Sequence, residues 1–370
     1  TSEAKFSEIS KKIGFAALKK FNPYVRFSEH PYVEAKIKGT KVNVVPCYIV
    51  EKGKWKSSAD RTQFHTKFML ENLSGSMKNN VRLLKQFLKN NGIYGAEISQ
   101  QGFSGYVSEV LVWNYGSFEG VIKAMSKIKP GEVIGKASKK FDTPITIVDP
   151  IDSQRNLAAA ISNENIGKFV LLCRNFVKKP SMAYFKQRKI RSSKSLLENC
   201  VVLNFKYKPR SPDIIWGQIK RASNAISTQL ELSGFEVIRS KAYTDEKNDA
   251  FLIFLLESPL ISKYYVKEGP EFFNADDSGG FVIKNEKTSL SMWVGKNKKI
   301  NALEKRAEND CKKFLRNVIS KGLDKSGIPK GIKSDIQKGY KISDGRKASK
   351  SIKAQLLELI STDAAIFSSN

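Results

Sequence analysis

The stretch Val42-Asn43-Val44-Val45-Pro46-Cys47-Tyr48 follows a turn at Lys38-Gly39, and the equally β-prone stretch Tyr32-Val33-Glu34-Ala35-Lys36-Ile37 precedes that turn. Successive side chains of a β-strand point to opposite faces, and a glycine turn between two β-prone stretches favours a hairpin. We therefore predict a hairpin in which Asn43 lies on one face and Val42 and Val44 lie on the other.

A helix and a third strand complete this first segment. Apolar residues recur at helical spacing from Phe6 to Phe21, and Asn22-Pro23 ends the pattern. The predicted strands cover residues 25–27, 32–37 and 42–48. One helix and three strands make a partial α/β domain with an open sheet edge, so we expect another segment or domain to cover that edge.

The rest of the chain changes character twice. From about Thr62 to Met182 the apolar periodicity is helical, which predicts a compact helical domain. From Cys200 onward, a strand, helix, strand, strand order predicts a ferredoxin-like sheet. Residues 321–353 are rich in lysine and glycine, and we predict little order there. The fold class is α+β with several domains: 1–60; 61–190; 195–258 together with 330–370; and 259–329 as a tail inserted in the C-terminal α/β domain.

The composition indicates a polyanionic partner. The chain of 370 residues carries 64 Lys and Arg against 36 Asp and Glu, a formal charge of +28 spread from end to end. No apolar run reaches the roughly 20 residues that cross a membrane, so nucleic acid fits the charge better than a membrane surface does. A merely basic, soluble protein is the alternative. The four cysteines are isolated from one another, which indicates neither a zinc site nor a disulfide framework.

Several short motifs allow both a structural and a functional interpretation. The glycine pairs around Phe103-Ser104, Tyr94 and Ser117 lack the spacing of known phosphate loops, and helix-to-helix turns explain them equally well. His65 fits either a buried structural histidine or, with nearby donors, a grip on a triphosphate. Lys85 and Tyr94 carry an ammonium and a hydroxyl that can bind phosphate oxygens together. Cys47 has no base beside it, so a nucleophilic role is not predicted.

Seven motifs occur in a fixed order: His30-Pro31-Tyr32-Val33, Val44-Val45-Pro46-Cys47-Tyr48, Asp60-Arg61-Thr62 with Phe64-His65, Val81-Arg82-Leu83-Leu84-Lys85, Asn91-Gly92-Ile93-Tyr94-Gly95-Ala96-Glu97, Gly102-Phe103-Ser104-Gly105-Tyr106, and Val148-Asp149-Pro150 with Arg155-Asn156. In order and spacing they resemble the archaeal, class I CCA-adding enzymes. The resemblance is specific over residues 24–188 and is architectural beyond them.

The resemblance implies an enzyme that adds cytidine, cytidine and adenosine to the 3′ end of tRNA from CTP and ATP. It implies a nucleotidyltransferase palm in which three carboxylates hold two Mg²⁺ ions, and a helical central domain like that of poly(A) polymerase and oligoadenylate synthetase. It also implies a cytoplasmic archaeal protein with no membrane partner. By resemblance, Thr62 touches the ribose, His65, Lys85 and Tyr94 bind the triphosphate, and Arg174 reads the base edge.

Two departures from the family pattern bear on activity. No Asp-x-Asp pair occurs in the chain, and Asn43 stands where the third metal-binding carboxylate is expected. A neutral amide oxygen is a poor ligand for two divalent ions. We therefore expect the first part of the head to be missing from this chain and the chain alone to be inactive. The alternatives are a non-catalytic tRNA-binding relative and one subunit of a split enzyme; a homodimer or a head supplied in trans is left open.

Overall fold

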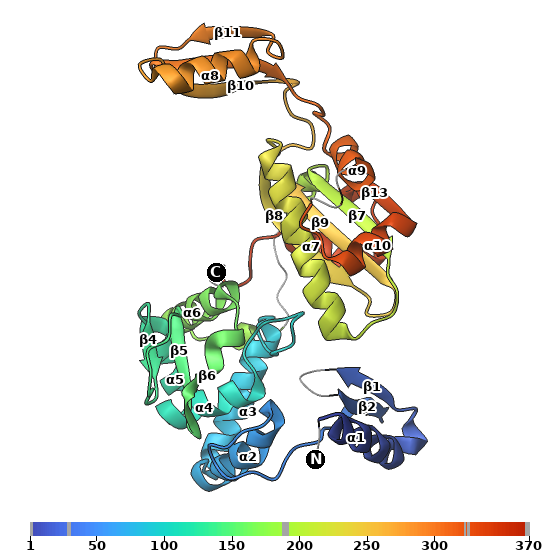
Figure 1. Cartoon of the computed structure of the whole chain (residues 1–370). Helices are drawn as coiled ribbons and strands as arrows, with labels where there is room; N and C mark the ends of the chain where they lie inside the picture. Colours follow the sequence, from blue (N-terminus) through green and yellow to red (C-terminus); the bar gives the residue numbers. More distant parts are fainter. Residues whose placement is uncertain (1–2, 28–30, 187–191, 322, 324–325, 367–370) are drawn as a thin grey trace. The chain divides into compact units, whose positions relative to one another are not determined.

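The computed structural model describes residues 3–27, 31–186, 192–321, 323 and 326–366 (Figure 1). His30, the first residue of the first family motif, lies outside these residues. The chain divides into two compact units. One comprises residues 1–191, 210–217 and 361–370, and the other comprises residues 192–209 and 218–360. Both units contain helices and sheets, so the prediction of a mixed α and β protein is confirmed.

The first unit begins with a helix packed on a small antiparallel sheet of order β1-β2-β3. A methyl group at Gly14 would lie 2.5 Å from Cγ2 of Val33, so the glycine is what lets the helix approach the sheet. Val42 and Val44 pack on the same buried face as Val33. The elements are α1 (Glu3–Leu18), β1 (Tyr24–Phe27), β2 (Pro31–Ile37) and β3 (Thr40–Val44).

The strand predicted over residues 42–48 is shorter than expected, because β3 ends at Val44. Pro46 has no backbone N–H and cannot donate to a sheet ladder, which accounts for the early end. Residues 45–50 have no regular secondary structure and lead toward the next helix.

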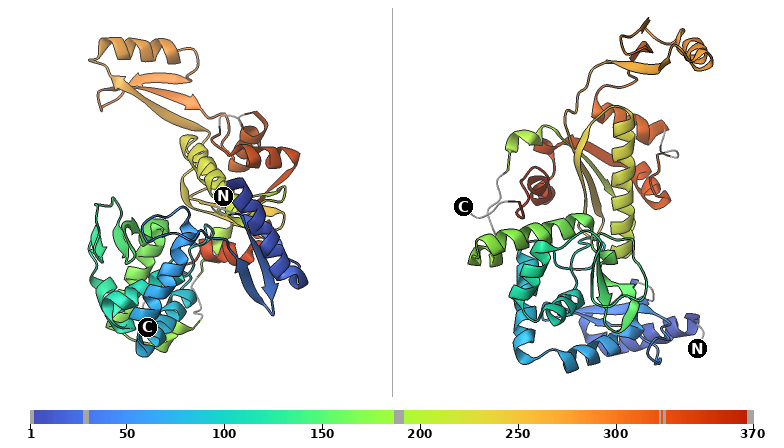
Figure 2. Two further views of the ribbon diagram at one scale, coloured as in Figure 1. Left: turned by 60° about the horizontal axis from the view of Figure 1, so that its bottom comes forward. Right: turned by 90° about the vertical axis from the view of Figure 1, so that its left-hand side faces the viewer.

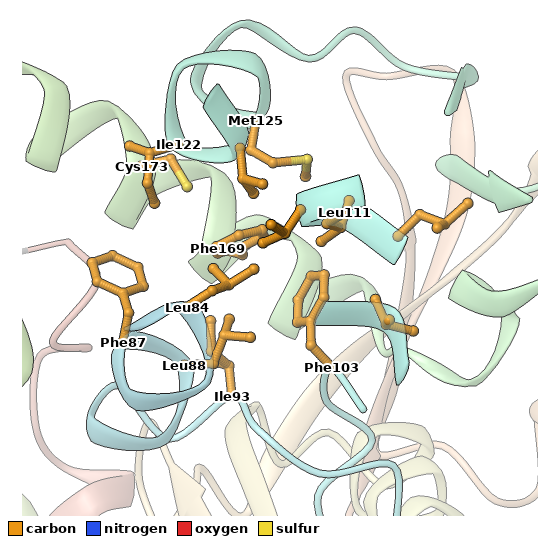
Figure 3. Packing of buried hydrophobic residues seen from close by; sticks show 14 of the residues in the cluster. Leu84, Phe87, Leu88, Ile93, Phe103, Leu111, Ile122, Met125, Phe169 and Cys173 are labelled. Carbon is orange, nitrogen blue, oxygen red and sulfur yellow. The ribbon is translucent and has the colours of Figure 1, made fainter. Parts of the chain in front are cut away.

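The middle of the first unit is built from helices around one apolar core (Figure 3). Leu84, Phe87 and Leu88 of one helix point into this core and meet Phe103 and Phe169 there. The helices are α2 (Arg61–Asn72), α3 (Gly75–Asn90), α4 (Gly105–Tyr115), α5 (Phe118–Lys127) and α6 (Asn163–Lys178).

The prediction that this region is helical throughout is wrong between residues 132 and 156. Three strands form a sheet there: β4 (Glu132–Ile134) pairs in parallel with β5 (Ile145–Asp149), and β5 pairs antiparallel with β6 (Asp152–Asn156). All five residues of β5 are buried. A fully buried strand carries no alternating pattern, so periodicity does not reveal it.

A C-terminal segment, residues 361–366, belongs to this first unit and packs on α6. Lys168 Nζ lies 3.1 Å from Oδ2 of Asp363. Asn175 Nδ2 donates to the carbonyl oxygen of Ala365 at 2.9 Å, and the Ala365 side chain is buried in the helical core. The last described residues therefore complete the packing of a helix that is formed almost 200 positions earlier in the sequence.

The second unit is centred on a four-stranded antiparallel sheet of order β13-β7-β9-β8. Its strands are β7 (Cys200–Lys206), β8 (Val237–Thr244), β9 (Asp249–Leu256) and β13 (Tyr340–Asp344). Cys200, Val202 and Ile253 on one face pack against α11 (Lys353–Leu359). In Figure 1 and in the right-hand view of Figure 2, α7 (Pro212–Leu232) runs along the sheet; from residue 218 onward it belongs to this unit.

A smaller sheet of order β10-β12-β11 follows β9, with α8 against it. Its elements are β10 (Tyr264–Glu271), α8 (Ala275–Asn285), β11 (Ser291–Val294) and β12 (Lys299–Lys305). After α9 (Cys311–Lys321) comes the stretch for which little order was predicted. That prediction is wrong for its described part, because α10 (Lys330–Lys338) buries Ile332 and Ile336 and β13 joins the main sheet.

Candidate nucleotide-binding site

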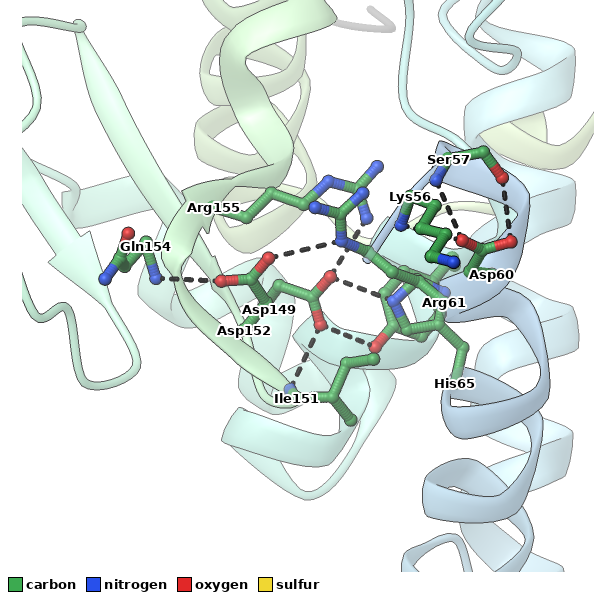
Figure 4. Close-up of polar contacts among 11 residues, drawn as sticks. Lys56, Ser57, Asp60, Arg61, His65, Asp149, Ile151, Asp152, Gln154 and Arg155 are labelled. Carbon is green, nitrogen blue, oxygen red and sulfur yellow. Dashed lines mark hydrogen bonds and ion pairs between the residues drawn. The ribbon is translucent and has the colours of Figure 1, made fainter. Parts of the chain in front are cut away.

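The start of α2 is fixed by Asp60, whose carboxylate accepts a hydrogen bond from the backbone N–H of Tyr48 (2.8 Å). It also accepts from the backbone N–H groups of Lys56 (2.9 Å) and Ser57 (2.8 Å) and from the Ser57 hydroxyl (2.8 Å) (Figure 4). Burial alone would raise the pKa of Asp60, but these four donors together lower it. The carboxylate thus ties the loop after β3 to the helix that carries Thr62.

Asp149, at the end of β5, is a second carboxylate with four hydrogen-bonding partners. Its Oδ2 lies 2.9 Å from Nε2 of His65 and 2.9 Å from Nη1 of Arg155. Its Oδ1 accepts from the hydroxyl of Tyr106 at 3.0 Å and from the backbone N–H of Ile151 at 3.1 Å (Figure 4). Four donors from α2, α4, β6 and the turn after β5 therefore meet on one buried group.

The electrostatics of this cluster favour the ionised carboxylate. Burial by itself would raise the pKa of Asp149, but hydrogen bonds and charge from His65, with the Ile151 amide and Arg155, lower it. Burial also raises the pKa of the Tyr106 phenol, and the nearby Asp149 charge raises it further, so Tyr106 stays a donor. The rings of His65 and Tyr106 lie 3.9 Å apart between centroids at an interplanar angle of 30°.

Lys85 and Tyr94 meet at the first residue of α4. A methyl group on Gly105 would lie 3.2 Å from the hydroxyl of Tyr94 and 3.4 Å from Nζ of Lys85. Lys85 Nζ is also paired with Oε1 of Glu109, one turn along α4, at 2.7 Å. A helix N-terminus carries partial positive charge, so an ammonium, a hydroxyl and this helix end form a position suited to an anion.

Thr62 and His65 stand three residues apart on α2, which places them on the same side of the helix. Thr62 is exposed, while His65 is partly buried against the Asp149 cluster. Tyr106 belongs to that cluster and lies next to Gly105, where Lys85 and Tyr94 meet. Four of the five predicted nucleotide-binding residues therefore lie around the first turns of α2 and α4.

The fifth, Arg174, lies elsewhere on the same unit. It is an exposed residue of α6, and its Nε donates to the carbonyl oxygen of Ser126 at 3.0 Å. Among the described residues, no hydrogen bond or ion pair connects it to His65 or Asp149. Arg155 is the arginine that the structure brings to the cluster. Sequence reasoning missed its role, although an acidic residue at the end of a mostly apolar run, Val148-Asp149, was a signal for a polar site.

Asn43 lies on the exposed face of β3, opposite to the face that holds the valines, as predicted. Its cross-strand neighbour is Glu34, which is buried and bonded to the hydroxyl of Tyr24 and, at 3.2 Å, to Nη1 of Arg26. Arg26 thus compensates the charge of Glu34, the carboxylate opposite Asn43. In the part of the chain that the structure describes, no group of three or more His, Cys, Asp or Glu side chains is arranged to hold a metal ion. These residues do not fit a two-metal site.

Comparisons with known proteins agree on one family. Residues 79–186 match the second domain of tRNA nucleotidyltransferases, and residues 197–345 match the C-terminal domain of CCA-adding enzymes. These two matches define the class of protein as tRNA nucleotidyltransferases. A CCA-adding enzyme of Pyrobaculum islandicum is 37% identical over 303 residues, which are 80% of this chain and 71% of that protein. The chain belongs to the CCA-adding enzyme family.

Two further relatives support the assignment. A CCA-adding enzyme of Saccharolobus shibatae is 38% identical over 300 residues, covering 80% of this chain and 71% of the relative. One from Pyrobaculum neutrophilum is 40% identical over 265 residues, covering 70% of this chain and 63% of the relative. Among the described helices, none combines the length and the apolar character needed to cross a bilayer.

Proposed function

We propose that this chain supplies the nucleotide-binding and tRNA-binding parts of an enzyme that adds or repairs the 3′-terminal CCA of tRNA from CTP and ATP. One observation carries the proposal: Lys85 and Tyr94 converge on the N-terminus of α4, next to Tyr106, whose ring contacts that of His65. In this arrangement Lys85, Tyr94 and His65 bind the triphosphate, and Thr62 reaches the ribose. The ammonium compensates phosphate charge, and the partial positive charge of the helix end favours an anion.

We assign the parts of the chain as follows. Residues 1–60 belong to the nucleotidyltransferase palm, and residues 61–190 are the central nucleotide-binding domain. Residues 195–258 with 330–370 form the tRNA-binding α/β domain, and residues 259–329 form the tail. The strand order β13-β7-β9-β8, with all neighbours antiparallel, supports a ferredoxin-like arrangement for the α/β domain.

Two arginines are candidates for hydrogen bonding to the base edge of the nucleotide. Arg174 is proposed from the family resemblance, and Arg155 is proposed from its place beside His65 on Asp149. Either guanidinium offers a fork of donors to the ring acceptors that cytosine and adenine share. The position of Arg155 in the same cluster as His65 favours Arg155.

Chemistry in this family implies a divalent ion such as Mg²⁺, which would compensate charge on the triphosphate and the attacking tRNA 3′ hydroxyl. The residues around Asn43 do not fit such a site, because Asn43 is neutral and the adjacent Glu34 is already paired with Arg26. We therefore propose that this polypeptide alone binds CTP and ATP but does not transfer the nucleotide. A carboxylate-bearing segment supplied in trans by a second polypeptide, as in a split enzyme, would restore transfer.

The second candidate function is a non-catalytic tRNA-binding relative, favoured by the same pairing of Glu34 with Arg26. One experiment separates the candidates. The chain is incubated with labelled CTP, Mg²⁺ and tRNA lacking its 3′ end, and direct binding of CTP and ATP is measured in parallel by calorimetry. Binding without incorporation supports the proposed nucleotide site; incorporation overturns the inactivity of the isolated chain; absence of nucleotide binding supports the non-catalytic relative. The cytoplasm, where tRNA is processed, is the proposed location.

A further inference from the structure

Asp149 uses all of its acceptor capacity on groups that come from separate parts of the first unit. Each of its oxygens accepts two hydrogen bonds, Oδ2 from His65 and Arg155 and Oδ1 from Tyr106 and the Ile151 amide. Its side chain is completely inaccessible to solvent. A carboxylate in this position cannot meet a nucleotide itself, so any contribution to binding passes through the groups that it holds.

The pairing decides which ring nitrogen of His65 carries a proton. The Asp149 carboxylate is held in its ionised form and can only accept, so the hydrogen bond of 2.9 Å requires a proton on Nε2. Within the described ranges of the chain, Nδ1 makes no hydrogen bond. Nδ1 is therefore the ring nitrogen that can meet a ligand, and the orientation of the ring is set by Asp149 on one edge and by the Tyr106 ring on its face.

The same oxygen that fixes His65 also holds Arg155. Nη1 of Arg155 lies 2.9 Å from Oδ2, and the Arg155 side chain is 38% exposed while Asp149 is inaccessible. The guanidinium thus has one nitrogen anchored on a buried carboxylate while part of the side chain stays accessible. A fixed fork of this kind keeps its geometry when a ligand arrives, which an unanchored surface arginine does not.

We propose that Asp149 is a positioning residue for nucleotide binding. It holds His65 with the proton on Nε2 and holds Arg155 beside it, so that both side chains reach the same nucleotide. The proposal rests on the proposed function, in which His65 contacts the nucleotide. The alternative is that Asp149 only stabilises the turn between β5 and β6, where its bond to the Ile151 amide lies.

Nuclear magnetic resonance of the imidazole nitrogens tests, without any nucleotide, whether Asp149 holds the proton of His65 on Nε2. The chain has only two histidines, His30 and His65, so a His30→Gln variant leaves a single imidazole to observe. At a pH where the ring is neutral, the expected spectrum shows the proton on Nε2 of His65. In an Asp149→Asn variant, we expect a mixture of the two tautomers, because an amide can either accept from or donate to the ring. A proton on Nδ1 in the unsubstituted site, or an unchanged tautomer in the variant, would overturn the proposal.

A double-mutant cycle for CTP binding to the full chain tests whether Asp149 contributes to nucleotide binding through the side chains that it holds. Asp149→Asn is expected to weaken binding about tenfold or more, the effect of losing one charge-assisted hydrogen bond. In a His65→Ala background, the same substitution should weaken binding by a clearly smaller factor, because half of what Asp149 positions is already gone. Equal factors in both backgrounds would show that Asp149 acts only on the turn and would overturn the proposal.

Asp152→Asn is the matched control, because Asp152 lies three residues away on the same hairpin and pairs with Arg61 at 3.2 Å without touching His65. It should leave the His65 tautomer unchanged; a change as large as that from Asp149→Asn would contradict a specific role for Asp149. If the chain binds no CTP, the proposed function fails. The tautomer measurement still decides whether Asp149 fixes the proton of His65 on Nε2. If the Asp149→Asn variant does not fold, the spectrum of His65 with Asp149 intact still tests the proposal, because a proton on Nδ1 would overturn it.

Discussion

Nζ of Lys85 lies 2.7 Å from Oε1 of Glu109, and the two residues come from adjacent helices, α3 and α4. Lys85 is therefore paired with a carboxylate at the position where we place a triphosphate. Both side chains are about a quarter exposed, with 25% and 27% of their surface accessible, so the pair can open without unfolding the helices. Binding of a phosphate at the N-terminus of α4 would exchange the carboxylate partner of Lys85 for a phosphate oxygen.

Replacing Lys85 by Ala removes the ammonium that faces this position. We expect CTP and ATP to bind at least about tenfold more weakly, because a charge-assisted hydrogen bond to phosphate is lost. Lys78→Ala on the same helix is the control, since Lys78 is exposed and lies more than one turn away. Calorimetric titration measures both affinities, and an equal effect of the two substitutions would contradict a specific phosphate contact.

Substituting Glu109 by Gln acts in the opposite direction. It removes a negative charge near the bound triphosphate and releases Lys85, so we expect nucleotide affinity to rise by a factor of about two to ten. The gain should be absent when Lys85 is already Ala. Weaker binding in Glu109→Gln alone would show instead that the carboxylate is needed to orient Lys85.

Arg155 and Arg174 can be ranked by their effects on CTP affinity. We expect Arg155→Ala to weaken binding by about tenfold and Arg174→Ala by less than twofold, because Arg174 donates to the Ser126 carbonyl away from the Asp149 cluster. Equilibrium dialysis with labelled CTP measures both variants. The reverse ranking would support Arg174 as the residue at the base edge.

Asp60 should give the fold an acid-sensitive contribution. Its pKa is lower in the folded chain than the ordinary value of about 3.9, so the stability it provides is present above that value and is lost as pH falls through the lower folded pKa. We expect Asp60→Asn to cost about 1–3 kcal/mol at neutral pH and progressively less as the pH falls below about 3.9. Unfolding midpoints of the two proteins across this range test it. A constant difference at all pH values would mean that the charge of Asp60 is irrelevant.

The formal charge of +28 predicts strongly salt-dependent binding of tRNA. Lysine and arginine side chains displace counterions from the phosphate backbone, so affinity should fall at least about tenfold between about 50 and 200 mM salt. Filter binding with tRNA lacking its 3′ end measures the slope. An affinity that is independent of salt would place the tRNA contact away from the basic surface.

Local patterns predicted much of the fold. The helix stripe that ends at Asn22-Pro23 and the hairpin that separates Asn43 from its valines were both correct, because each depends only on neighbouring residues. The sheet β4-β5-β6 was missed because a fully buried strand such as Ile145–Asp149 has no alternation to detect. The helix α10 was also missed, because its stretch has few apolar residues. Two of them, Ile332 and Ile336, are nevertheless buried.

The candidate site followed a similar division. Thr62, His65, Lys85 and Tyr94 were predicted through the motifs of the family resemblance, and their roles stay predictions. The roles of Tyr106, Glu109, Asp149 and Arg155 were not predicted, because each depends on a partner from another element. Lys85 and Glu109 lie 24 positions apart, and His65 and Asp149 lie 84 positions apart. Spacing along a chain contains no information on such long-range pairs.

The return of residues 361–366 to α6 has a consequence for synthesis of the protein. During translation the first unit emerges early, but its partner segment around Asp363 and Ala365 is made only after the whole second unit. At typical elongation rates of about 5–20 residues per second, α6 waits on the order of ten seconds or more for that segment. Until then Lys168 and Asn175 lack these contacts, so a nascent chain exposes this side of α6 to chaperones, and the helical unit reaches its final packing after translation of the second unit is complete.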